Sequence, residues 1–329
     1  MLFCLYLRRI MANTFCTIIT ADYYPKALAL YKSLAQFNRS VRLVVLVADD
    51  KPLSRFGKLP ENISAIPAGN LSGYSLVNEL YKKYAAADMD SFRWSLKPVF
   101  ISYLLEHDFE KALYLDCDMF LFNDYEFLFS ELDEASILLT PNWINSDPLV
   151  DKESFFSLFT SGFFSAGFIG ANKEGLPALK WWAGACHFMM GEHIQHGIRA
   201  DQKYLDVFPV KFEKTKILRH QGCNIGAWNY NECKREWVNG EVMINGQFPV
   251  IFMHFDEMMV KGILRGYDKL LLPHFEQYQK VFEESGYPLS DFIKTIPTHI
   301  NPGMVKKIKW GLRLKTRIKQ KLYQLSQKL

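Results

Sequence analysis

A pair of aspartates inside a strongly apolar run constrains this chain more than any other feature. In residues 113–122 (LYLDCDMFLF), apolar and aromatic side chains lead up to Asp116 and Asp118 and resume directly after them. The run predicts a buried strand that leaves the core at its carboxyl end. Carboxylates there are costly unless they are paired or hold a cation, and Asp-x-Asp suits Mg²⁺ or Mn²⁺ carrying a diphosphate. The alternative is that both aspartates cap the turn or the following helix.

The composition is that of a globular protein. Hydrophobic residues make up 49% of the 329 residues, which is enough for one large domain with additions or for two domains. The six cysteines follow no zinc-binding or C-x-x-C spacing, so we expect reduced thiols and a cytoplasmic location. These cysteines are Cys4, Cys16, Cys117, Cys186, Cys223 and Cys233.

The C-terminal tail differs in charge from the rest of the chain. Residues 304–329 contain nine Lys or Arg residues and no acidic residue, which leaves the body with 30 basic and 35 acidic residues. Apolar residues of the tail recur on one face of a helix, and Trp310 lies among the basic residues. This pattern predicts a basic amphipathic helix on an anionic membrane surface, with a solvated or packed helix as the alternative. Nucleic acid is disfavoured because the acidic body would repel it.

The first half of the chain alternates between apolar strands and helices. This alternation predicts an α/β fold with a mixed, mostly parallel sheet flanked by helices. Pro98 is expected in the first turn of a helix at residues 99–106. The predicted strands are 14–20, 42–48, 63–66, 137–140, 163–170 and 250–255. The expected divisions are an N-terminal extension (1–12), the main domain (13–272), a helical segment with linker (273–303) and the basic tail (304–329).

Five short motifs occur in an order that resembles glycosyltransferase family 8. This family includes glycogenin and bacterial lipopolysaccharide glucosyl- and galactosyltransferases. The resemblance implies a GT-A fold, a nucleotide-diphosphosugar donor, usually a UDP-sugar, and a divalent cation. The matching stretches are residues 15–34, residues 94–97 with 113–122, residues 164–167 (FSAG), residues 200–202 (ADQ) and residues 252–255 (FMHF).

The resemblance assigns the metal ligands. Asp116 and Asp118 match the family's Asp-x-Asp, and His254 matches its third protein ligand. An imidazole with two carboxylates suits Mn²⁺ better than Mg²⁺. Taken without the resemblance, His254 is also typical of a core histidine beside a strand end.

The resemblance also assigns the residues that contact the donor. Ser165 stands where the family commonly has Asn, and Lys261 follows His254 at a longer spacing than the family's lysine. Tyr24 suits stacking on a base or a role at the helix start, and Lys97 is either a phosphate contact or a solvated charge. The assigned donor-binding residues are Thr20, Ala21, Tyr24, Lys97, Ser165 and Lys261.

Asp201 and Gln202 match the family's pair beside the reacting sugar. The family retains anomeric configuration, which requires a covalent intermediate or attack on the front face. An amide oxygen is a poor nucleophile, so we expect Gln202 to stabilise positive charge at the anomeric carbon and Asp201 to bind sugar hydroxyls. Asp201 also suits the N-cap of a helix.

The favoured function is retaining, metal-dependent transfer of a hexose to a glycan or a lipid-linked glycan such as lipopolysaccharide. A peripheral location on the cytoplasmic membrane face would suit such an acceptor. One alternative is a phosphohydrolase with Asp116 as the nucleophile, which phosphate release from a simple monoester would reveal. The other is a membrane-associated protein that binds nucleotide sugars without turnover.

Overall fold

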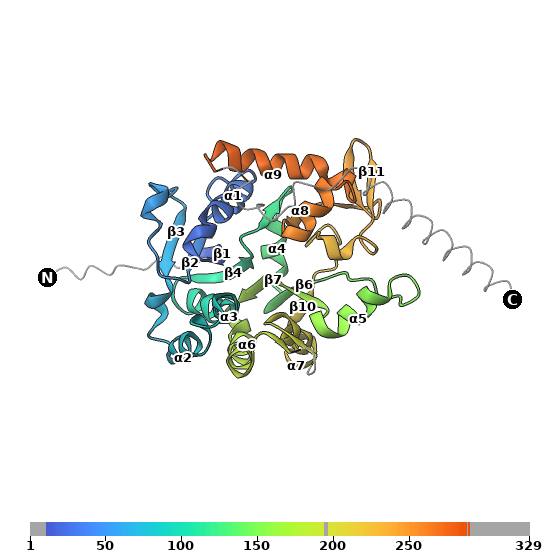
Figure 1. Ribbon diagram of the computed structural model, residues 1–329. Coiled ribbons are helices and arrows are strands. Elements are labelled where there is room, and N and C mark those ends of the chain that lie inside the picture. The colour runs from blue at the N-terminus through green and yellow to red at the C-terminus, as the bar shows by residue number, and fades with distance from the viewer. Residues whose placement is uncertain (1–10, 194–196, 288, 290–329) are drawn as a thin grey trace.

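The computed structural model describes residues 11–193, 197–287 and 289, and Figure 1 shows a central sheet covered by helices. The N-terminal residues 1–10 and the predicted tail helix, residues 304–329, lie outside the described residues. No helix within the described ranges has the length and apolar character needed to cross a membrane.

The central sheet has seven strands in the order β10-β6-β7-β4-β1-β2-β3. Neighbouring strands pair in parallel except where β7 lies antiparallel between β4 and β6, so the sheet is mixed and mostly parallel, which confirms the predicted fold class. The strands are β1 (Met11–Ile19), β2 (Leu43–Val47), β3 (Ile63–Pro67), β4 (Phe109–Leu115), β6 (Ile137–Pro141), β7 (Phe164–Asn172) and β10 (Thr215–Ile217).

Helices cover both faces of the sheet because its strands are apolar on both sides. Along β1, Cys16 and Ile18 face one core, whereas Phe15 and Ile19 face the other. The first core is closed by α2, α3 and α6 and the second by α1 and α4, as Figure 1 shows. These helices are α1 (Tyr24–Ala35), α2 (Ser75–Leu80), α3 (Met89–His107), α4 (Glu126–Glu131) and α6 (Leu176–Phe188).

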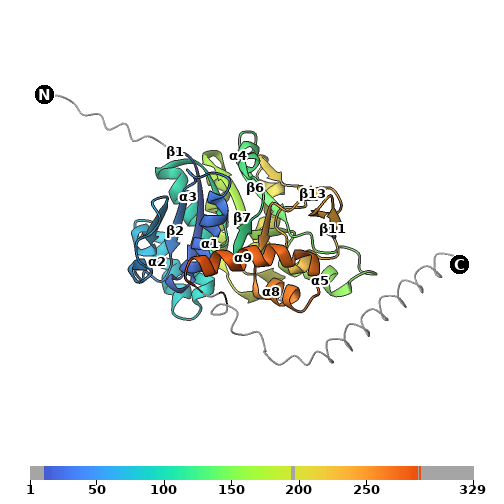
Figure 2. The same cartoon turned by 90° about the horizontal axis from the view of Figure 1, so that it is seen from above.

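A third core joins the C-terminal elements to a short ribbon formed by β5 and β14. Phe120 of β5 packs against Tyr278 of α9, and α9 crosses the molecule beside α1 and α8 (Figure 2). The apolar face of α9, which forms the start of the predicted helical segment 273–303, therefore packs on the body of the fold. The elements of this region are β5 (Met119–Leu121), β11 (Arg235–Val238), β12 (Glu241–Ile244), β13 (Phe248–Pro249), β14 (Phe252–His254), α8 (Glu257–Leu264) and α9 (Leu272–Glu284).

Pro98 lies inside a helix, and its predicted place in a first turn is wrong. α3 runs from Met89 to His107 through this proline. Its start is fixed by Asp88, whose Oδ1 accepts a hydrogen bond from the Asp90 backbone N–H at 3.0 Å. Burial of the face around Pro98 offsets the missing backbone donor, and the long helix carries Lys97 to the carboxyl edge of the sheet.

Two further α-helices and two further strands belong to the described part of the chain, beside several short 3-10 and π-helical segments. Helix α5 and strand β9 border the carboxyl edge of the sheet, where the predicted site lies. The elements are α5 (Lys152–Ser161), α7 (Phe208–Lys211), β8 (Glu192–His193) and β9 (Ile198–Arg199).

Candidate active site

The two aspartates lie in the turn between β4, which ends at Leu115, and β5, which begins at Met119. β5 pairs antiparallel with β14 in a register that sets His254 opposite Met119. This ribbon brings His254 to the turn, and one ligand atom from each of Asp116, Asp118 and His254 lies within 4.8 Å of the others. The structure therefore brings together the three predicted metal ligands.

Asp118 lies between two cationic groups. His254 Nε2 is 2.9 Å from its Oδ1, and Lys26 Nζ is 3.9 Å from its Oδ2. Burial lowers the pKa of His254, but the charge and hydrogen bond of Asp118 outweigh burial and raise this pKa to about 9. Burial raises the pKa of Asp118, but His254 and Lys26 outweigh burial and hold it well below its usual range. Asp118 is therefore held in its negatively charged form and His254 in its positively charged form.

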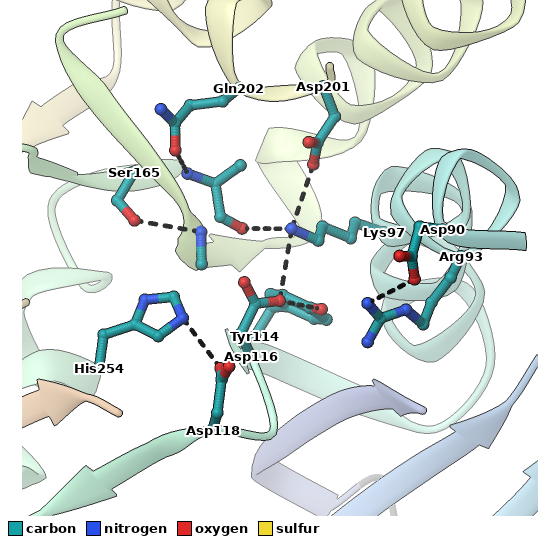
Figure 3. A network of polar contacts seen from close by, with 12 residues as sticks. Asp90, Arg93, Lys97, Tyr114, Asp116, Asp118, Ser165, Asp201, Gln202 and His254 are labelled. Atoms are coloured by element: carbon teal, nitrogen blue, oxygen red, sulfur yellow. Dashed lines mark hydrogen bonds and ion pairs between the residues drawn. The ribbon is translucent and has the colours of Figure 1, made fainter. Parts of the chain in front are cut away.

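Lys97 connects the aspartate turn to the Asp201 segment (Figure 3). Its Nζ lies 3.3 Å from Asp116 Oδ1 and 3.2 Å from Asp201 Oδ2 and donates to the Ala166 carbonyl at 3.1 Å. The Tyr114 hydroxyl donates to Asp116 Oδ1 at 2.6 Å. Burial lowers the pKa of Lys97, but the two carboxylates outweigh burial and raise this pKa above its usual value. Lys97 thus remains charged and fixes both carboxylates.

Gln202 is held at both ends of its amide group. Its Nε2 donates to the Ser161 carbonyl at 2.7 Å, and its Oε1 accepts from the Ala166 backbone N–H at 3.2 Å. Asp201 precedes a short 3-10 helix, Gln202–Val207, but its side chain makes no capping hydrogen bond and instead points to Lys97 (Figure 3). Asp201 thus occupies the predicted N-cap position, but its carboxylate pairs with Lys97 and does not cap the helix.

These groups line a cavity of about 380 Å³. Ser165 lines it as well, with its Oγ accepting a hydrogen bond from the Gly167 backbone N–H at 3.2 Å. Asp116 and His254 of the metal cluster and the Asp201–Gln202 pair therefore face one cavity, together with aromatic and cationic side chains. The lining includes Trp94, Lys97, Asp116, Asp201, Gln202, Trp228, His254 and Arg199.

The cluster fits a divalent cation. Gly167 lies so close to the cluster that an added Cβ would be 3.1 Å from Asp116 Oδ2 and 3.2 Å from His254 Cε1. Because glycine has no side chain, Asp116 and His254 can occupy these positions without a steric clash. Nδ1 of His254 is buried and has no hydrogen-bond partner among the described residues, so a ring nitrogen remains unused. Two carboxylates and an imidazole are ligands that suit Mn²⁺ and, less well, Mg²⁺.

No family model matches the chain. YfnF, an uncharacterized protein of Bacillus subtilis strain 168, is 28% identical over 260 residues, which span 77% of this chain and 84% of YfnF. The galactosyltransferase LgtC, solved in complex with donor and acceptor sugar analogs, is similar with a TM-score of 0.51 at 15% identity over 88% of this chain and 98% of LgtC. The bifunctional glycosyltransferase WbbM gives a TM-score of 0.53 at 11% identity over 88% of this chain and 52% of WbbM. The chain has a GT-A fold.

In this GT-A fold, the predicted nucleoside contacts lie around the end of β1 and outside the cavity lining. Thr20 follows the strand, and the backbone N–H of the buried Ala21 donates to Asp49 Oδ1 at 3.0 Å. The Tyr24 ring is 2% exposed and packs 4.9 Å from the Phe56 ring between centroids. Stacking of Tyr24 on a base therefore has no support from its position in the core.

Lys261 does not line the cavity either. It lies in α8 and forms an ion pair with Glu257, one helical turn away. The spacing of these two residues in the sequence is the signal that predicts such a pair. Ser165 and Lys97 are thus the predicted donor residues that the structure brings to the cavity.

Lys26 and Trp228 are among the residues near the GT-A site that the sequence did not reveal. Lys26, beside Asp118, is recognisable as a lysine in the first turn of a helix, where a positive charge opposes the helix dipole. The Trp228 ring lies 5.5 Å from the His254 ring, and its Nε1–H donates to the Asn142 carbonyl at 2.8 Å. No local motif marks Trp228, since its position depends on contacts between distant segments.

Proposed function

We propose that the protein is a retaining, metal-dependent glycosyltransferase that moves a hexose from a nucleotide sugar, a UDP-sugar, to a glycan. The cavity in the GT-A fold is the observation that carries this proposal. The carboxylate of Asp116 and the imidazole of His254 line this cavity together with Asp201 and Gln202. Transfer from a nucleotide sugar requires the groups that bind the diphosphate and those that bind the sugar to lie side by side, because diphosphate and sugar are joined at the reacting carbon.

Asp116, Asp118 and His254 would hold the cation, Mn²⁺ or Mg²⁺, which when bound neutralises the charge on the departing nucleoside diphosphate. The chain fixes these ligands in advance. Tyr114 and Lys97 both contact Oδ1 of Asp116, which leaves its Oδ2 for the cluster. Catalysis gains from this arrangement because the ligands need little rearrangement when the donor binds.

Retention of configuration is explained by attack on the face from which the diphosphate departs. The acceptor oxygen bonds to the anomeric carbon, the bond from that carbon to the phosphate oxygen breaks, and the acceptor proton passes to the phosphate oxygen. Gln202 Oε1 uses one lone pair for the Ala166 N–H and retains another toward the cavity, where it stabilises positive charge at the anomeric carbon. Asp201, fixed by Lys97, binds sugar hydroxyls.

An apolar surface beside the cavity supports a lipid-linked glycan, such as lipopolysaccharide, as the acceptor. Helix α5 contributes Ser157 and Ser161 to the cavity wall, while Phe156 and Phe159 on the same helix are 55% and 53% exposed. Lys152 Nζ lies 5.7 Å from the Phe156 ring centroid. Exposed aromatic rings with adjacent cations suit an anionic membrane surface, so we propose that the enzyme acts at the cytoplasmic membrane face.

The first test is thermal stability with UDP-, GDP-, ADP- and CMP-sugars in the presence of Mn²⁺, Mg²⁺ or EDTA. A ligand at about 100 times its dissociation constant adds roughly 2.7 kcal/mol to the free energy of unfolding. We expect stabilisation by a UDP-sugar that requires the cation and is lost in Asp118→Asn. Absence of stabilisation by every nucleotide sugar would refute the proposal.

Turnover distinguishes the transferase from its alternatives. With an acceptor panel that includes lipid-linked glycans, we expect nucleoside diphosphate release together with a product of the donor's anomeric configuration. In the proposed transferase, Tyr114 and Lys97 hold Oδ1 of Asp116 and its Oδ2 serves the cation, whereas a phosphohydrolase would use Oδ2 as the nucleophile. Release of inorganic phosphate from simple monoesters, or binding without any turnover, would favour the respective alternative.

A further inference from the structure

Lys26 is a cation beside the metal cluster that the proposed reaction has not used. It lies in the first turn of α1, and its Nζ is 3.9 Å from Asp118 Oδ2 and 5.0 Å from the Tyr23 ring centroid. Its side chain is 15% exposed and lines a second cavity of about 150 Å³, together with Tyr23 and Glu257. Lys26 is therefore held close to Asp118 and remains accessible from this cavity.

The position of Lys26 is unfavourable for a lysine unless an anion lies beside it, and in this structure that anion is Asp118, a predicted metal ligand. The N-terminus of a helix carries a partial positive charge, and α1 has no side-chain cap. A cation held by Asp116, Asp118 and His254 would add further positive charge next to the ammonium group. A ligand that carries negative charge to the same place removes both conflicts.

The other candidate for this role is paired with a residue outside the metal cluster, whereas Lys26 is paired with Asp118 inside it. Lys261, which the family resemblance assigns to the diphosphate, forms an ion pair with Glu257 within α8. It lines neither of the two cavities described above, whereas Glu257 lines the smaller one. In this structure Lys261 therefore neutralises an acidic group at the cavity, and Lys26 supplies the cation.

We propose that Lys26, rather than Lys261, is the lysine that binds the diphosphate group of the nucleotide-sugar donor. This assignment rests on the proposed function. The sugar end of the donor lies in the larger cavity with Asp201 and Gln202, and the diphosphate extends past the metal cluster toward Lys26. Arg93, whose Cζ is 5.4 Å from the Tyr23 ring centroid, adds a second positive charge behind this ring.

The assignment predicts that removing the charge of Lys26 changes the affinities for a nucleoside diphosphate and for Mn²⁺ in different directions. In Lys26→Gln, affinity for a nucleoside diphosphate in Mn²⁺ should fall about tenfold or more, the effect of losing a hydrogen bond to a charged group. Affinity for Mn²⁺ alone should stay equal or rise, because a repelling charge next to the cluster is removed. Affinity for the free nucleoside should not change. Lys26→Arg, which keeps the charge, should retain most of the diphosphate affinity.

Isothermal titration of the full chain measures all three affinities, with UDP as the first probe and GDP, ADP and CDP alongside. Glu257→Gln/Lys261→Gln is a control of unchanged net charge, and Lys32→Gln removes another lysine of α1, one that donates to Ser285 Oγ at 2.8 Å. Neither control should lower the diphosphate affinity as much as Lys26→Gln.

Three outcomes would overturn the assignment while leaving the proposed function in place. They are an unchanged diphosphate affinity in Lys26→Gln, an equal loss of affinity for the free nucleoside, and a larger loss in the Glu257→Gln/Lys261→Gln control. Failure of the unaltered protein to bind any nucleoside diphosphate would instead refute the proposed function itself.

Discussion

Lys97 and Arg235 are both buried cations paired with carboxylates, but Lys97 faces the large cavity and Arg235 lines neither cavity described above. The side chains of Lys97 and Asp201 are 3% and 4% exposed, and those of Arg235 and Asp268 are 1% and 8% exposed. Burial is thus similar in the two places. The difference between them lies in how many of the polar atoms are already satisfied.

The network of Arg235 is closed. Its Nε donates to Asp268 Oδ2 at 2.9 Å, its Nη2 to the Gly226 carbonyl at 2.8 Å, and its Nη1 to the Cys233 carbonyl. A guanidinium group provides several donors in a rigid plane, so it can hold separate loop segments together. This network fixes the region of β11 and has no capacity left for a ligand.

The network of Lys97 is open. Asp201 Oδ2 is buried and has no partner with hydrogen-bond geometry among the described residues, although Lys97 Nζ lies 3.2 Å away. Asp116 keeps a side chain that is 25% exposed toward the cavity. An incomplete network is costly for stability and useful for chemistry, because a substrate can supply the missing partners.

The largest expected effect is on stability, at Arg235. Arg235→Met should lower the free energy of unfolding by about 3–5 kcal/mol, because it leaves the buried Asp268 without its partner. Donor turnover per folded molecule should stay unchanged. Denaturant unfolding and a turnover assay on the folded fraction would measure both quantities. Arg235→Met/Asp268→Leu should recover most of the stability, and a double variant no better than the single one would contradict this account.

The next effect is on turnover, at Lys97. Lys97→Met should reduce turnover about 100-fold, the magnitude typical for loss of one electrostatic contact in an active site. Its effect on unfolding should be smaller than that of Arg235→Met, because Asp116 and Asp201 face a cavity that water can enter. Steady-state kinetics and denaturant unfolding of both variants test the contrast. The same loss of stability with normal turnover would show that the Lys97 network is structural as well.

Two glycines of β7 allow the same comparison between the site and the core, with smaller expected effects. A Cβ on Gly167 would lie 3.1 Å from Asp116 Oδ2, whereas a Cβ on Gly170 would lie 2.9 Å from both Leu113 Cδ2 and Leu138 Cβ. Gly167→Ala should weaken Mn²⁺ binding about tenfold, since it displaces ligands, as loss of supporting contacts around a metal does. Gly170→Ala should instead lower stability by about 1–3 kcal/mol through overpacking and leave Mn²⁺ affinity unchanged. Calorimetric Mn²⁺ titration of both variants would decide, and equal affinities would contradict the proposed position of the cation.

The sequence predicted the sheet and its carboxyl edge well, because both depend on local patterns. Apolar runs mark β1, β2 and β4, and the aspartates after β4 mark the edge. That His254 joins Asp116 and Asp118 as the third member of the cluster was predicted from the family resemblance alone. Physically it depends on the pairing of β5 with β14, two short strands that are distant in sequence and whose register no local pattern determines.

The donor contacts are harder to predict from sequence, because neighbouring residues at the start of a helix face different directions. Tyr24 enters the core at 2% exposure, while Tyr23 is 38% exposed at the same edge. Lys26, in the same first turn of α1 as Tyr24, reaches Asp118, and Lys261 is paired with Glu257 instead. A linear motif fixes the order of such residues, but the packing of α1 and α8 fixes which of them reaches the ligand.

His274 completes the comparison, because it is a partly buried ionisable group whose ring nitrogen Nδ1 is buried without a charged partner among the described residues. Its ring packs 4.6 Å from the Phe122 ring between centroids, and Nδ1 has no hydrogen-bond partner within the described part of the chain. Burial lowers the pKa of His274 to about 4. Whereas Lys97 and Arg235 are buried beside carboxylates, the folded state keeps His274 neutral at neutral pH.

This prediction is the smallest and concerns pH. Below about pH 6.5 the unfolded chain binds a proton at His274 that the folded chain does not bind until about pH 4, so stability falls as the pH is lowered. Between pH 6.5 and 5.5 the loss should be about 1 kcal/mol. Urea unfolding at both pH values should show this loss reduced in His274→Gln and retained in His107→Gln, a variant of a surface histidine. If His274→Gln keeps the full loss, burial without a partner does not hold this imidazole neutral, and the cost assigned to leaving Lys97 or Arg235 unpaired would need to be lowered as well.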